Sequence, residues 1–110
     1  MSDTVSGVFA ALGDPTRRGI YEELLGAPEG RTATDLATTA TISRQAIVKH
    51  LQVLMRADLA STIREGREVR YVARRDGAQG ASRWLADRTA EWDRRLAALE
   101  KRVSDSRRHS

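Results

Sequence analysis

Polar side chains that can bind the edges of DNA bases recur on one side of a helix expected to begin after Ser43 and end near Asp58. At 100° per residue, Gln45, Lys49 and Gln52 lie nearly opposite the apolar side of this helix. Glutamine pairs with adenine, arginine and lysine pair with guanine or phosphate, and a valine can meet the thymine methyl group. An ordinary amphipathic surface helix would show the same pattern, but the preceding turn and the basic segment that follows favour DNA. We expect DNA contacts from Ser43, Arg44, Gln45, Val48, Lys49 and Gln52.

A β-hairpin is expected directly after this helix. Residues 59–64 and 69–74 have strand propensity, and the short loop between them contains Gly66, which is typical of a hairpin. Arginines at such a tip can grip the phosphate backbone or enter a narrow minor groove. The alternative is a surface network in which Glu65 and Glu68 pair with these arginines. We expect DNA contacts from Arg64, Arg67 and Arg70.

The positive charge of the chain is concentrated on these two segments. The net charge is +4, and residues 43–75 alone carry 8 basic and 3 acidic residues. A concentrated basic patch points to a polyanionic partner, although a solvated basic surface would have the same composition. We therefore expect double-stranded DNA as the partner.

Two helices should precede this region. Apolar residues at i, i+3, i+4 and i+7 predict a helix over residues 4–12. Asp14 suits the N-cap of a second helix and Pro15 suits its first position, where a missing N–H has no cost. Residues 26–30 should end this helix, whose buried face we assign to Ile20, Tyr21, Leu24 and Leu25.

A helix-turn-helix motif follows. Thr32 and Asp35 have the spacing of a capping box at the start of a short third helix, and residues 38–42 are the expected turn. Ser43 is a good N-cap for the fourth helix. The hairpin would be the wing, and the fold class is mainly α with a small β-hairpin: a winged helix-turn-helix of five helices and a two-stranded wing, in the order α-α-α-α-β-β-α.

The last helix, expected over residues 78–103, carries an apolar stripe that requires a partner helix. Leu85, Thr89, Trp92, Leu96, Leu99 and Val103 step alternately by four and three residues, as in a coiled coil. Tryptophans here could instead stack on an apolar effector, although aromatic residues on such a helix more often form interface core. We expect a homodimer whose interface contains Val5, Val8, Phe9, Leu12, Trp84, Leu85, Trp92, Leu96 and Leu99.

Composition excludes several classes of protein. The 110 residues fit one domain over residues 1–103, with a disordered tail at 104–110. The absence of cysteine removes disulfides and thiolate sites, and two distant histidines, His50 and His109, make no metal site, so no metal and no cofactor is expected. His50 should be a partly buried, hydrogen-bonded structural residue. We find no apolar run of membrane-spanning length, no signal peptide and no nucleotide, hydrolase or metalloprotease motif, so we expect a cytoplasmic protein that is not an enzyme.

Three stretches carry a family resemblance: FAALGDPTRR at residues 9–18, ISRQAIVKHLQVL at residues 42–54, and REGR at residues 64–67 followed by Tyr71. With these stretches, the chain resembles the ArsR/SmtB-type winged-helix repressors over roughly residues 5–103. The resemblance implies a homodimeric bacterial repressor, built around its first and last helices, that occludes a promoter until an inducer loosens it.

The chain departs from the family pattern in three places. Metal-sensing members keep cysteines on the helix that corresponds to residues 32–39, or acidic and histidine ligands on the last helix, and this chain keeps neither set. It therefore resembles the cysteine-free, non-metal-sensing branch. Gln45 stands where proline is common, and Thr41 and Asp58 replace frequent glycines, which should stiffen or shift the turn and the start of the wing.

Other classes of function stay open on the sequence alone. A winged-helix protein-interaction module with an acidic protein partner could use the same basic hairpin. A small-molecule-binding regulator with a tryptophan-lined pocket is compatible with DNA binding. An enzyme ranks third, because no nucleophile, base and orienting residue can be assembled around His50.

Overall fold

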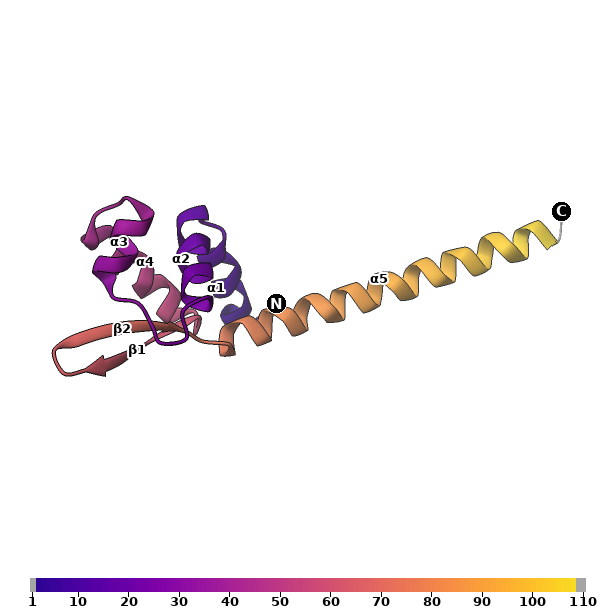
Figure 1. The fold of residues 1–110 in the computed structure, drawn as a ribbon. Helices are drawn as coiled ribbons and strands as arrows, with labels where there is room; N and C mark the ends of the chain where they lie inside the picture. Colours follow the sequence, from indigo (N-terminus) through magenta and orange to yellow (C-terminus); the bar gives the residue numbers. More distant parts are fainter. Residues whose placement is uncertain (1, 109–110) are drawn as a thin grey trace.

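The computed structural model describes residues 2–108 and has five helices with a two-stranded antiparallel sheet in those residues. Four helices and the wing form a globular head, and the fifth helix projects from it (Figure 1). This arrangement confirms the predicted fold class and the order of its elements. The bounds are α1 (Asp3–Leu12), α2 (Pro15–Leu25), α3 (Ala33–Ala40), α4 (Arg44–Arg56), β1 (Ala60–Glu65), β2 (Glu68–Ala73) and α5 (Asp76–Arg108).

Helices α2, α3 and α4 begin at the predicted N-caps. The Asp14 carboxylate accepts hydrogen bonds from the backbone N–H groups of Thr16 at 2.8 Å and Arg17 at 3.2 Å. The bond from Arg17 contributes most to holding the pKa of Asp14 below its usual value. The side chains of Thr32 and Ser43 accept from the backbone N–H three residues ahead, each at 3.1 Å. These local bonds fix where α2, α3 and α4 start.

The core lies where α1 to α4 meet the start of the wing. The apolar side of α4 is fully buried there, as predicted from its periodicity, while α1, α2 and α3 each contribute further apolar side chains. The largest fully buried side chains are those of Val8, Leu24, Leu36, Ile47, Leu51, Leu54 and Leu59.

Helix α5 has 33 residues, which corresponds to a length of about 50 Å. Its first turns pack on α1, where the ring of Trp84 meets that of Phe9 edge-on with centroids 5.8 Å apart. The rest projects, so the molecule measures 75 × 24 × 23 Å (Figure 1). Despite its length, neither α5 nor any other helix within residues 2–108 is apolar enough to cross a membrane.

Several element boundaries differ from the sequence predictions. Helix α5 begins at Asp76 rather than 78 and continues to Arg108, so residues 104–108 are helical instead of the expected disordered tail. Residues 109–110, with His109, lie outside the described residues. The turn before α4 is shorter than predicted, since the hydroxyls of Thr38 and Thr39 donate to carbonyls four residues back within α3.

The predicted buried and interface residues also need correction. Leu25 was assigned to the buried face of α2 but is 54% exposed, whereas Leu24 beside it is 1% exposed and faces the core. Val5 and Val8, expected at a dimer interface, are 9% and 1% exposed and belong to the chain's own core. The apolar side of α1 packs on α5 of the same chain, which leaves these two valines no surface for a partner.

Candidate nucleic-acid interface

The polar side of α4 forms one continuous open surface. Ser43, Arg44, Gln45, Lys49 and Gln52 are exposed, and Val48 is half-buried. A shallow hollow of about 460 Å³ is lined by Arg44, Gln45, Val48, Lys49 and Gln52. Ile47, Leu51 and Leu54 on the other side of the helix are buried, so α4 holds these five side chains on a rigid support.

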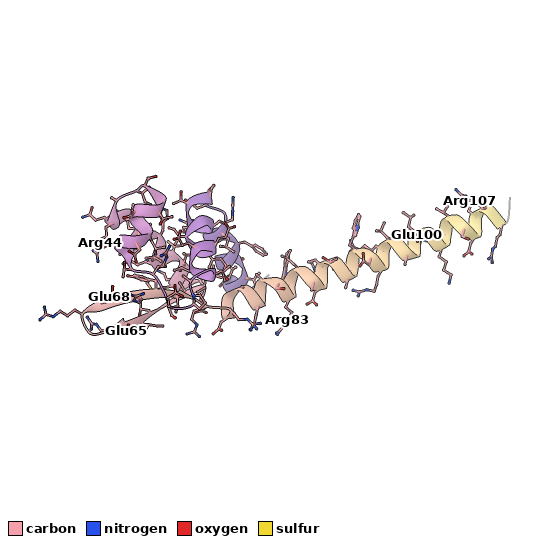
Figure 2. The ribbon with its side chains drawn as sticks, in the orientation of Figure 1. Arg44, Glu65, Glu68, Arg83, Glu100 and Arg107 are labelled. Atoms are coloured by element: carbon pink, nitrogen blue, oxygen red, sulfur yellow. The ribbon has the colours of Figure 1, made fainter. Side chains whose placement is uncertain are left out.

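A second hollow joins this surface to the wing. It has a volume of about 450 Å³ and lies between the start of α3, Arg44 at the start of α4, and the wing. Since Arg44 lines both hollows, the surface runs without a break from α4 to the hairpin. Figure 2 shows Arg44 and Glu68 at the end of the molecule away from Glu100 and Arg107 on α5. The second hollow is lined by Thr32, Ala33, Thr34, Asp35, Arg44, Arg67, Glu68, Val69 and Tyr71.

Two of the three predicted wing arginines are open to solvent. Gly66 and Arg67 form the two-residue loop of the hairpin, and Gly66 takes the φ of +60° that such a loop requires. Arg64 lies opposite Val69 in the strand register, so both side chains are on the face of the hairpin that lines the second hollow. Among residues 2–108, the side chains of Arg64 and Arg67 make no hydrogen bond or ion pair.

Arg70, the third arginine predicted to contact DNA, is paired within the chain, unlike Arg64 and Arg67. It lies opposite Ile63 in the register, which places it on the other face of the hairpin. Its Nε and Nη2 atoms lie 3.2 Å from the Glu68 carboxylate, and its Nη1 donates to the carbonyl oxygen of Gly30 at 3.4 Å. Arg70 is therefore held within the chain. Its pairing with Glu68 matches the alternative in which the wing glutamates pair with the wing arginines.

Sequence reasoning missed the contribution of α3 and Tyr71 to this surface. Thr32 and Thr34 line the second hollow, as does Tyr71 from β2. Thr32 was identified only as a helix cap, and Tyr71 only as a strand residue and as part of the family resemblance. The capping box was the available signal for the start of α3, but only the tertiary fold brings that start beside Arg44 of α4.

The structure also shows the surroundings of His50 and of the two tryptophans, Trp84 and Trp92. His50 is half-buried on α4, but among the described residues it has no hydrogen bond of the predicted kind. No group of three potential ligands in that part of the chain could hold a metal ion. Trp84 packs on Phe9, with the Arg88 guanidinium 5.6 Å from its ring centroid, whereas Trp92 is 60% exposed. The two tryptophans are about 12 Å apart along α5.

The head, with its turn-linked helices, exposed polar α4 face and basic hairpin, defines a winged helix-turn-helix DNA-binding protein. Residues 12–63 match a family of helix-turn-helix domains. Over 81 residues the chain is 35% identical to the transcriptional repressor SdpR of Bacillus subtilis (strain 168). This match covers 74% of this chain and 88% of that protein.

Solved structures agree with this match. An ArsR-like transcriptional regulator from Rhodococcus sp. RHA1 superposes with a TM-score of 0.77 at 42% identity, over 89% of this chain and 91% of that one. A homodimeric winged helix-turn-helix domain from Mycobacterium bovis, described as a possible ArsR-family regulator, superposes with a TM-score of 0.60 at 26% identity. The match covers 86% of this chain and 82% of that one. The chain belongs to the ArsR family: it is a transcriptional regulator and not an enzyme.

Proposed function

We propose that this protein is a homodimeric repressor that binds a pseudo-palindromic operator in the bacterial cytoplasm and leaves it when an inducer binds. The SdpR relative is named a repressor, and the Mycobacterium bovis neighbour is a homodimer. The observation that carries the proposal is the α4 surface, where five side chains able to contact bases or phosphates line one open hollow.

In this proposal, α4 enters the major groove and the wing follows the adjacent backbone. Gln45, Lys49 and Gln52 supply sequence preference through base edges, while Ser43, Arg44, Arg64 and Arg67 bind phosphates and supply most of the affinity. Two copies related by a two-fold axis place their α4 helices about 34 Å apart, one turn of DNA.

The dimer would form through the apolar stripe of α5 and the adjoining end of α1. Its proposed interface comprises Phe9, Leu12, Trp84, Leu85, Trp92, Leu96 and Leu99, which are half-buried or exposed in the single chain. These apolar side chains would otherwise remain in contact with water, so their burial favours association.

Binding to the protein's own upstream DNA tests the proposal. Fluorescence anisotropy would compare the upstream fragment with scrambled DNA of equal length over a series of salt concentrations. We expect tighter binding to the upstream fragment and a linear fall of log affinity with log salt, because phosphate contacts release counterions. No binding to either DNA at low salt would contradict the proposal and favour an acidic protein partner for the same basic surface.

Two substitutions separate base reading from phosphate binding. Gln45→Ala should reduce the discrimination between operator variants by about ten-fold or less. Arg67→Ala should weaken binding to all sites evenly and lower the slope of log affinity against log salt by about 1. Gln79→Ala, an exposed glutamine at the start of α5, is the matched control and should change neither. An unchanged preference profile in Gln45→Ala would show that the reading face is assigned incorrectly.

A further inference from the structure

We propose that the ion pair between Glu23 of α2 and Arg31 positions the wing, and through it Arg67, for contact with DNA. The proposal rests on the proposed function and adds to it two residues that lie outside the DNA-binding surface. The tip of the hairpin, at Gly66 and Arg67, is exposed, so its direction depends on how the rest of the wing is held.

The distal half of the wing has no support of its own. Residues 62–68 are all exposed, although Arg67 and Glu68 border the open hollow between the wing and the starts of α3 and α4. A two-stranded hairpin is at best marginally stable by itself in water. The direction of the tip must therefore be set where the base of the wing joins the head.

That joint is an isolated antiparallel β-bridge between Tyr71 of β2 and Arg31, in the segment before α3. The backbone N–H of Arg31 donates to Tyr71 O at 2.9 Å, and the N–H of Tyr71 donates to Arg31 O at 2.8 Å. Gly30 precedes it with φ of +88°, and a Cβ there would lie 3.0 Å from the Cβ of Arg70 and 3.1 Å from Tyr71 O. The close approach of this segment to β2 is therefore specific to glycine.

The Glu23–Arg31 pair connects this joint to α2. The Arg31 Nη2 donates to the Glu23 carboxylate, and this bond raises the pKa of Arg31. The Nε of Arg31 is buried without a hydrogen-bond partner, so the guanidinium is fixed through Glu23 and not from its other side. Loss of the Glu23 charge would weaken the hold on the Arg31 side chain, and the backbone bridge to Tyr71 would lose one of its ties to α2.

A small movement at this joint is amplified at the wing tip. Arg67 lies four residues from Tyr71 along β2, or about 13 Å at the rise of a strand. A rotation of about 10° at the joint would displace the tip by about 2 Å, which is enough to break a phosphate contact of hydrogen-bond length. Arg44 on α4 would not move with the wing, because the apolar side of its helix is packed in the core.

A double-mutant cycle on operator affinity tests the proposal. In the wild-type background, Arg67→Ala should weaken binding about five-fold. In the Glu23→Gln background, the same change should cost less than about two-fold, because the wing no longer holds Arg67 on the DNA. Arg44→Ala should cost the same in both backgrounds. Glu91→Gln, which breaks exposed ion pairs on α5, is the matched control and should leave the Arg67 penalty unchanged.

Hydrogen exchange gives a readout that does not require DNA. Glu23→Gln should speed amide exchange at Arg31 and Tyr71 while the amides of α4 keep wild-type protection. Additive penalties in the cycle, or a fall in the Arg44 penalty equal to that of Arg67, would overturn the proposal. If the wild type binds its operator but Arg67→Ala costs nothing, the wing proposal fails alone. If the wild type shows no operator binding, the proposed function fails with it.

Discussion

At the residue scale, two side chains occupy a backbone conformation that usually belongs to glycine. Thr41 has φ 54° and ψ 41° at the C-cap of α3, and Asp58 has φ 57° just after α4. These are the positions where the family often has glycine. The left-handed region costs an L-residue roughly 1–2 kcal/mol, most for a β-branched one, while aspartate tolerates it better. The chain thus keeps the geometry of the motif and accepts strain at Thr41.

Thr41→Gly should therefore stabilise the protein by about 0.5–1 kcal/mol, the relief of strain exceeding the extra flexibility of glycine in the unfolded chain. Urea denaturation measures this change. Thr38→Gly, an exposed threonine inside α3, is the control and should destabilise by about 0.5 kcal/mol. A Thr41→Gly variant less stable than wild type would mean that the hydroxyl bond to Ala40 O outweighs the strain.

Asp14 makes a second residue-scale prediction, on the pH dependence of stability. Its carboxylate caps α2, and the backbone bond from Arg17 lowers its pKa in the folded state. The stabilisation is therefore complete above the unfolded-state pKa of about 3.9 and is lost as the pH falls through the lower folded value.

Asp14→Ala should lower the urea midpoint clearly at pH 7, and the difference from wild type should shrink as the pH falls below about 4. Midpoints measured at several pH values check this. A difference that stays constant down to pH 2 would show that the ionised carboxylate is not the source of the stabilisation.

At the element scale, a glycine of α5, Gly77, lies against the end of α4. The N–H of Gly77 donates to Asp58 O at 3.0 Å, and a Cβ on Gly77 would lie 2.1 Å from the carbonyl oxygen of Ala57. The start of α5 thus lies directly against the end of α4. No side chain larger than hydrogen fits there unless the two helices separate.

Gly77→Ala should destabilise the protein by about 2 kcal/mol or more, because backbone atoms on both sides must shift. Gly80→Ala is the matched control: nothing lies within 4 Å of its Cβ position, and the change should stabilise the helix by about 0.5–1 kcal/mol. Thermal unfolding of the two variants provides the comparison. Equal effects would mean that the α4–α5 joint is not tightly packed.

Sequence reasoning succeeded at this scale where structure is decided locally. The caps at Asp14, Thr32 and Ser43 and the buried side of α4 follow from neighbouring residues, so the motif and the exposed polar side of α4 could be predicted. The position of Arg70 could not, because strand register decides which face of the hairpin it occupies. The periodicity of α1 likewise marked Val5 and Val8 as buried but could not tell a partner's helix from α5 of the same chain.

At the scale of the whole molecule, the exposed apolar surface is gathered on the projecting helix. Leu85, Trp92, Leu96, Leu99 and Val103 are among the few large apolar side chains exposed in the described residues. An isolated helix gains little stability in water without packing of its apolar face, and the contacts with α1 reach only the start of α5. A second copy of the chain would cover the stripe and bring two reading helices onto one operator.

Leu96→Asp should therefore dissociate the proposed dimer, because it would bury an unpaired charge in the seam. Sedimentation should show a monomer, and operator affinity should fall about 100-fold or more, since a single head loses the gain from two linked contacts. Ala97→Asp, which falls about 100° around the helix, is the matched control and should remain dimeric. A Leu96→Asp protein that sediments like wild type would remove α5 from the interface. A monomer with undiminished operator affinity would instead show that one head suffices to read the site.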